Sequence, residues 1–156
     1  KLESEYPFLE NTDLSIKNLE MKGKYSFQYV QNAIIEDSVL DTKDAFWHSE
    51  NVTVKNSVVK GEYLGWYSRN LKLINCRISG TQPFCYCENL VLEHCVMEDT
   101  DLCFERSTVN AQIDSAVDSI KNPLSGRIQA RAVGERIFDL DWIDPSQTRI
   151  EEGDFE

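Results

Sequence analysis

Apolar residues recur along the chain at intervals of 19 positions. Several series do so at once, and they keep constant offsets from one another. Because independent series share one period, the chain is predicted to be a repeat protein whose units stack on one another. The clearest series are Leu14, Ala33, Val52, Leu71, Leu90 and Val109; Ile16, Ile35, Val54, Leu73, Leu92 and Ala111; and Met21, Leu40, Val59, Ile78 and Met97.

Apolar and polar residues alternate within each unit, as in residues 52–54 (Val-Thr-Val) and 71–73 (Leu-Lys-Leu). A period of two is typical of β-strands, and a 19-residue unit is too short for a helical-hairpin repeat. Stacked units of this kind lie about 4.8 Å apart. The predicted fold is therefore all-β, a right-handed single-stranded parallel β-helix with about 19 residues per coil. A leucine-rich repeat fits less well, since Asn75 comes one position too early and the leading Leu is absent.

Polar residues form further series at the same period. Asn tolerates the left-handed backbone conformation and Gly adopts it freely, so these series predict the corners of the coil. His94 replaces Asn in one series and is therefore interpreted as a turn residue, not a catalytic one. The corner series are Asn32, Asn51, Asn70 and Asn89; Asn18, Asp37, Asn56, Asn75 and His94; and Gly23, Gly61 and Gly80.

The repeat predicts one β-helix domain over residues 1–156, with regular coils over 13–131. Residues 1–12 fit the second half of a coil, so we expect the C-terminal part of a longer solenoid. The exposed strand edges of its first coil would favour self-association. Residues 127–130 fit the same register 19 positions after residues 108–111. Residues 132–156 are expected to form a cap, with Trp142 and Ile143 folded over the last coil, and a solvated acidic tail.

Composition excludes several classes of function. Sixteen Lys and Arg against 27 Asp and Glu give a net charge of −11, which argues against a nucleic-acid partner and against an anionic membrane surface. No apolar stretch is long enough to span a membrane. We expect no cofactor.

Five cysteines, an odd number, cannot all pair with one another. We interpret them as buried, reduced thiols and expect no metal site, although a structural zinc or a disulfide framework stays an alternative. With no leader sequence, they favour a cytoplasmic location. The cysteines are Cys76, Cys85, Cys87, Cys95 and Cys103.

Three neighbouring series carry most of the aromatic residues. They are Phe27, Phe46, Gly65, Phe84 and Cys103; Gln28, Trp47, Trp66, Cys85 and Phe104; and Tyr29, His48, Tyr67, Tyr86 and Glu105. If this segment is a strand, the middle series faces opposite to the other two. Because the small residues Ser49 and Ser68 share its parity, we expect Trp47 and Trp66 inside. This predicts an exposed strip, with Cys103 outside as a candidate reactive thiol; the strip comprises Tyr29, Phe46, His48, Tyr67, Phe84 and Tyr86.

An exposed aromatic strip on a water-soluble protein predicts a binding surface. The favoured hypothesis is a non-catalytic solenoid that binds a carbohydrate or a protein partner there, unless the rings only stabilise the coil. The alternative is a polysaccharide hydrolase or lyase with a site in a lateral groove. The acids considered for that role are Asp99, Asp101, Glu105, Asp41, Asp44 and Glu62.

Several strings of the sequence resemble an uncharacterised bacterial family, domain of unknown function 3737. The resemblance runs from about residue 25 to about residue 150, and it implies a pectate-lyase-like right-handed β-helix within longer chains. It implies no catalytic residue. The strings are residues 44–54 (DAFWHSENVTV), 61–66 (GEYLGW), 87–91 (CENLV), 107–109 (STV) and 118–126 (DSIKNPLSG).

Overall fold

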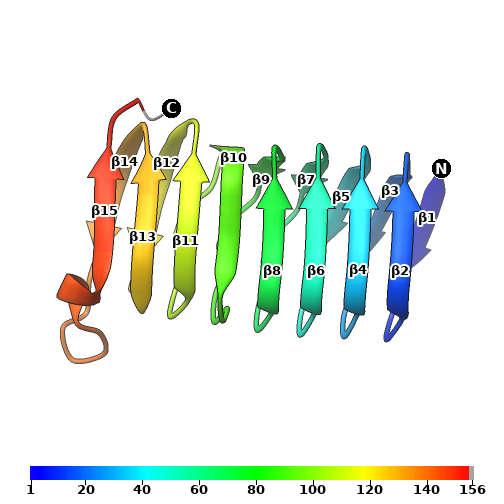
Figure 1. Ribbon diagram of the computed structural model, residues 1–156, viewed down its shortest axis with the longest axis horizontal. Coiled ribbons are helices and arrows are strands. Elements are labelled where there is room, and N and C mark those ends of the chain that lie inside the picture. The colour runs from blue at the N-terminus through cyan, green and yellow to red at the C-terminus, as the bar shows by residue number, and fades with distance from the viewer. Residues whose placement is uncertain (155–156) are drawn as a thin grey trace.

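The computed structural model describes residues 1–154 as a stack of coils, each made of two strands and a turn segment (Figure 1). One face of the stack consists of β1 (Leu2–Glu5), β3 (Glu20–Lys24), β5 (Val39–Lys43), β7 (Val58–Lys60), β9 (Arg77–Ser79) and the end of β10 (Leu90–Glu98). The other face consists of β2 (Thr12–Lys17), β4 (Gln31–Glu36), β6 (Glu50–Lys55), β8 (Arg69–Ile74), the start of β10, β11 (Thr108–Ile113), β13 (Ser125–Ala130) and β15 (Thr148–Glu152).

Every strand pairing is parallel, and through β10 most pairings join residues 19 positions apart, such as Val54 with Leu73. In Figure 1 the strands on the near face run upward, and the chain advances along the axis from right to left. This combination makes the coil right-handed. The prediction of a parallel β-helix is confirmed. Among the described residues, no helix is long and apolar enough to cross a membrane.

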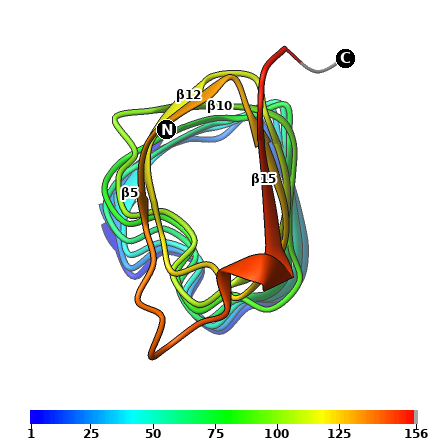
Figure 2. The same ribbon diagram turned by 90° about the vertical axis from the view of Figure 1, so that its left-hand side faces the viewer.

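Most of the coils superimpose when viewed along the axis (Figure 2). Their inward side chains form one continuous core. The three apolar series predicted from the sequence lie in it, and Ile35, Val54 and Leu73 are fully buried. Burying one such side chain contributes about 1.5–3 kcal/mol, so each coil gains stability from its own members of the series. In the first coil, the corresponding residues Leu14 and Ile16 are only partly buried.

The Asn, Asp and His corner residues adopt the left-handed conformation that the sequence predicts, as do Gly61 and Gly80, whereas Gly23 does not. Asn70, for example, has φ +54°. Its side chain donates a hydrogen bond to Asn51 Oδ1 (2.9 Å) and accepts one from Asn89 Nδ2 (2.7 Å). At another corner Gly61 also has positive φ, and a Cβ there would overlap the carbonyl oxygen of Thr42. The corners are therefore fixed both by backbone preference and by a ladder of side-chain amides.

The turn segment of each coil is not the strand that the alternation rule for its aromatic residues assumes. In residues 44–48, Asp44, Phe46 and His48 all have positive φ. The N–H of Phe46 donates to the preceding coil, at Ser26 O, whereas that of His48 donates to the following coil, at Trp66 O. Because the backbone is not extended, the rule that neighbouring side chains face opposite ways does not hold here.

The coils continue beyond the boundary expected at residue 131. β12 (Ala116–Lys121) pairs with β14 (Ala132–Ile137), and β13 pairs with β15, which follows the 3₁₀ turn η1 (Pro145–Gln147). Ser125, not Arg127, lies beside Thr108, so the expected 19-residue register is wrong here by two positions. The period fades in the sequence because pairings in this region join residues 16, 17 or 22 positions apart.

The C-terminal cap and acidic tail also differ from the expectation. Ile143 is buried, but Trp142 is 62% exposed and does not cover the last coil. Glu151 belongs to β15, where Arg127 donates to its carboxylate at 3.0 Å; this ion pair and nearby hydrogen bonds lower the Glu151 pKa. Residues 155–156 of the expected tail lie outside the described residues.

Asn70 offers a test of what holds the corners. Asn70→Gly keeps the left-handed backbone and removes only the amide ladder, whereas Asn70→Ala removes both. The alanine variant is expected to be less stable than the glycine variant by about 1 kcal/mol, because a Cβ disfavours this conformation. Urea unfolding of both variants measures the difference; an alanine variant as stable as the glycine variant would contradict the corner assignment.

Candidate functional site

The structure corrects two members of the predicted aromatic strip. Phe46 and Phe84 are fully buried, and they belong to a phenylalanine stack inside the solenoid. Phe46 packs on Phe27 with ring centroids 5.0 Å apart, and Phe84 packs on Phe104 at 6.2 Å. The error follows from the turn conformation, which sends the Phe position inward and the position two residues later outward.

The four remaining members lie side by side on the surface, and we call them the aromatic column: Tyr29, His48, Tyr67 and Tyr86. Adjacent ring centroids are 4.7, 5.0 and 4.9 Å apart, and the ring planes lie within 9° of parallel. Tyr29 is 50% exposed and Tyr67 44% exposed, whereas Tyr86 is half-buried. The sequence therefore predicts the column correctly as a surface feature.

Trp47 and Trp66 were expected in the core, but they are half-buried beside the aromatic column. Their rings stack at 5.2 Å, and the Trp66 ring meets Tyr67 and Tyr86 edge to face. Each indole N–H donates to a carbonyl in the next coil, Trp47 to Tyr63 O and Trp66 to Gln82 O. The tryptophans thus support the aromatic column from one side and satisfy their polar atoms within the protein.

The regular register breaks by a single position directly after the aromatic column. The N–H of Tyr67 donates to Cys85 O, which precedes Tyr86 in the chain. The N–H of Tyr86 donates instead to Glu105 O, one position later than the repeat would place its acceptor. Phe104, not Cys103, therefore lies beside Phe84. By the same shift Arg106, not Glu105, occupies the position that follows Tyr86 in the aromatic column.

This shift also corrects the expectation of an exposed thiol. Cys103 is fully buried, and burial raises its pKa well above the ordinary range. Burial likewise raises the pKa of Cys85 to about 12 and that of Cys87 to about 11. All five cysteines are buried and unpaired, and within residues 1–154 no cluster of three or more metal-ligating side chains occurs.

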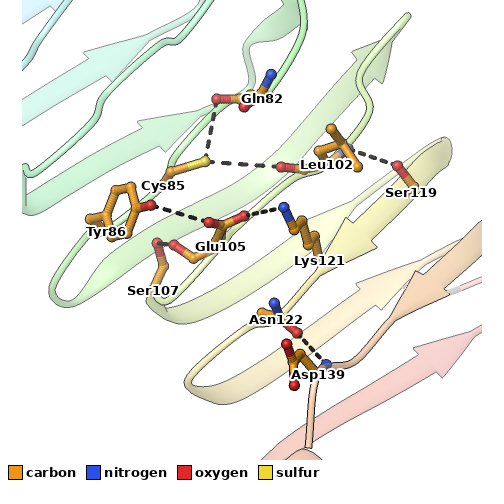
Figure 3. A network of polar contacts seen from close by, with 10 residues as sticks. All are labelled: Gln82, Cys85, Tyr86, Leu102, Glu105, Ser107, Ser119, Lys121, Asn122 and Asp139. Carbon is orange, nitrogen blue, oxygen red and sulfur yellow. Dashed lines mark hydrogen bonds and ion pairs between the residues drawn. The ribbon is translucent and has the colours of Figure 1, made fainter. Parts of the chain in front are cut away.

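A cavity of about 380 Å³ lies where the aromatic column ends. In its lining, the Glu105 carboxylate accepts a hydrogen bond from the Tyr86 hydroxyl (3.1 Å) and pairs with Lys121 Nζ (3.1 Å; Figure 3). Partial burial, followed by the neighbouring Glu105 charge, raises the pKa of Tyr86. The residues that line the cavity are Tyr86, Glu105, Arg106, Lys121, Asn122, Asp139 and Trp142.

The far side of the cavity is formed by the loop that precedes η1. The Asn122 side chain accepts a hydrogen bond from the Asp139 N–H (2.7 Å), which attaches this loop to the preceding coil. Trp142 reaches back from the loop, and the Arg106 guanidinium lies 4.1 Å from its ring centroid. The sequence analysis missed Arg106, Lys121, Asn122, Asp139 and Trp142 as site residues, because only the register shift and the loop bring them to the aromatic column.

Most of the acids considered for catalysis lie away from this cavity. Of the six, only Glu105 lines it. Asp44 is buried among the turn segments, and burial is the main cause of its raised pKa, with Glu62 adding to it and Lys43 opposing it. Glu88 and Arg69, which lie near the turn segments in the sequence, form an exposed ion pair at 3.0 Å.

Comparison with known proteins identifies a family but no activity. The model of the family described as "Protein of unknown function (DUF3737)" matches residues 1–151. The chain belongs to this family. No curated protein and no solved structure matches the chain. The resemblance read from the sequence is thus confirmed, and any function has to be argued from the site itself.

Phe46 and His48 provide a matched test of which rings are internal. Phe46→Ala is expected to lower the free energy of unfolding by about 3–5 kcal/mol, because it leaves a cavity in the phenylalanine stack. His48→Ala, two residues away on the surface, should change it by less than about 1 kcal/mol. Urea denaturation of both variants measures this; equal losses would place the two columns on the same side of the coil.

Asp44 predicts a specific pH dependence of stability. A carboxyl whose pKa is raised on folding stabilises the protein in its protonated form, and this contribution is lost as the pH rises through the folded-state pKa. Asp44→Asn removes the charge permanently. The variant's stability relative to the parent should therefore increase from pH 4 to pH 7 in thermal unfolding. Asp41→Asn, at an exposed position, is the control. The same trend in both variants would refute the assignment of the pH dependence to Asp44.

Proposed function

We propose that the protein is a non-catalytic carbohydrate-binding solenoid, and that its site is the cavity at the end of the aromatic column. The observation that carries the proposal is that the last ring of the column, Tyr86, lines a polar cavity together with a second aromatic residue, Trp142.

Ring faces restrict where a sugar can bind. The C–H groups of a sugar ring pack on the face of an aromatic ring, where the π-electron density lies. Within the aromatic column, His48 and Tyr67 each have a stacked neighbour on both sides, so they present mainly their edges to solvent. The face of Tyr86 that points away from Tyr67 meets no further ring of the aromatic column, because the next position is Arg106, whose guanidinium lies over Trp142. The end of the column is therefore a better platform than its middle.

The polar groups of the cavity suit sugar hydroxyls. A carboxylate accepts hydrogen bonds, an ammonium donates them, and an amide does both; Glu105, Lys121 and Asn122 supply these three groups. A volume of about 380 Å³ lies within the usual range for small-molecule sites. Two aromatic side chains with convergent polar groups are the composition expected of a site that binds a polar, ring-shaped ligand.

A glycoside hydrolase is the alternative, since two carboxylates, Glu105 and Asp139, line the same cavity. Both are already engaged. Glu105 is paired with Lys121 and accepts from Tyr86, and Asp139 Oδ1 accepts from the Asp141 N–H at 3.1 Å. A general acid needs a carboxyl group that can reach the leaving group, whereas the Glu105 carboxylate is occupied by Lys121 and the Tyr86 hydroxyl. Binding without turnover is the better-supported function.

The proposal is tested by screening the protein against a glycan array and measuring the hits by calorimetry. Tyr86→Ala should weaken binding at least tenfold, about 1.4 kcal/mol, because it removes the platform. Tyr86→Phe should stay within a few-fold of the parent, since it keeps the ring. Tyr29→Ala, at the other end of the same column, is the matched control and should bind normally.

Three outcomes would overturn the proposal. They are the absence of any bound glycan, equal losses for Tyr29→Ala and Tyr86→Ala, and cleavage of the bound glycan. The first would favour a protein partner for the aromatic column, and the third would favour the hydrolase. Thermal unfolding of each variant shows whether a loss of binding reflects a loss of fold.

A further inference from the structure

Arg106 is a cation of the cavity that forms no ion pair among the described residues. None of the ion pairs among residues 1–154 includes it, whereas Lys121 in the same cavity is paired with Glu105. Its backbone N–H donates to Asn122 O, which fixes the start of the side chain. Its guanidinium lies over the Trp142 ring, 4.1 Å from the centroid. The guanidinium is thus oriented by the protein while its donors have no acidic partner.

An oriented guanidinium is suited to one class of ligand group. Its planar fork of N–H donors matches an oxyanion with two coplanar oxygens, and it binds such a group through two parallel hydrogen bonds. Because the guanidinium makes a cation–π contact with Trp142 and takes part in none of the ion pairs of residues 1–154, its N–H groups stay available for this contact. A Lys at this position would offer a point charge without the same directionality.

The four charged side chains that line the cavity sum to zero, but they are not all paired. Lys121 is paired with Glu105, whereas Arg106 and Asp139 form no ion pair with each other, so Arg106 can pair with one negative charge on a ligand. A second negative charge on the ligand would meet no further unpaired cation among the residues that line the cavity. The chain as a whole also carries −11, which disfavours a dianion such as a phosphate monoester. A monoanionic carboxylate fits best.

We propose that the ligand of this cavity is an acidic sugar whose carboxylate is bound by Arg106, with the sugar ring on Tyr86. This inference rests on the proposed carbohydrate binding and adds the chemical class of the ligand. Arg106 thereby becomes the residue that determines specificity, and Trp142 the residue that positions it. Neutral sugars of the same shape lack the group that Arg106 would bind.

The test compares methyl glucuronide with methyl glucoside, which differ only in the carboxylate, by calorimetry on the full chain. The uronide is expected to bind at least tenfold more tightly. Arg106→Gln should abolish this preference, and Arg106→Lys should reduce it to a few-fold. Both substitutions keep a long, unbranched side chain at a position with φ +52°, so neither relieves or adds backbone strain. Trp142→Leu, which removes the ring beneath the guanidinium, should weaken uronide binding by a larger factor than glucoside binding.

The possible failures are distinguishable. Equal affinities for the two sugars, or a preference that survives Arg106→Gln, would overturn the acidic-sugar inference and leave carbohydrate binding intact. If neither these two sugars nor any other glycan binds, both proposals are wrong. Circular dichroism and thermal unfolding of the Arg106 variants confirm that each retains the parent fold.

Discussion

The structure depends on parallel hydrogen bonding between successive coils in a fixed register. In the regular coils each strand pairs with its equivalent in the next repeat, so every residue lies beside its own counterpart, as Val52 lies beside Leu71. Like side chains then stack on like, apolar on apolar inside and amide on amide at the corners. A single coil could not bury its apolar residues alone, and the stack as a whole supplies one continuous core.

The same constraint places the candidate site. The aromatic column exists because the turn segment repeats its backbone conformation from coil to coil, which sends Tyr29 and its equivalents outward with adjacent ring centroids 4.7 to 5.0 Å apart. The site lies where that repetition stops. One extra residue before Phe104 places Arg106, not Glu105, after Tyr86 in the aromatic column, and the loop that ends at η1 brings Trp142 against Arg106. A regular surface thus ends in an irregular cavity that carries several kinds of polar group.

The sequence predicts the repeats well because strand residues obey a simple rule. Val54, Leu73 and their equivalents alternate with polar neighbours, and the period of the repeat follows directly from them. The turn segment obeys no such rule, since most of its left-handed residues are Tyr, Phe or His, which give no signal comparable to Asn or Gly. The register shift was equally hidden, because the pairing of Leu90 with Val109 restores the regular spacing after the insertion. Trp142 joins the site through a loop contact that no periodicity records.

The most direct test of this account is a solution NMR measurement of contacts between rings on adjacent coils. The account predicts nuclear Overhauser effects between Phe27 and Phe46, which occupy equivalent positions of the repeat, and between Phe84 and Phe104, which do so only after the register shift. It also predicts contacts between Arg106 and the Trp142 indole. Contacts of Phe84 with Cys103 in place of Phe104, or an Arg106 side chain distant from Trp142, would contradict both the register and the site built on it.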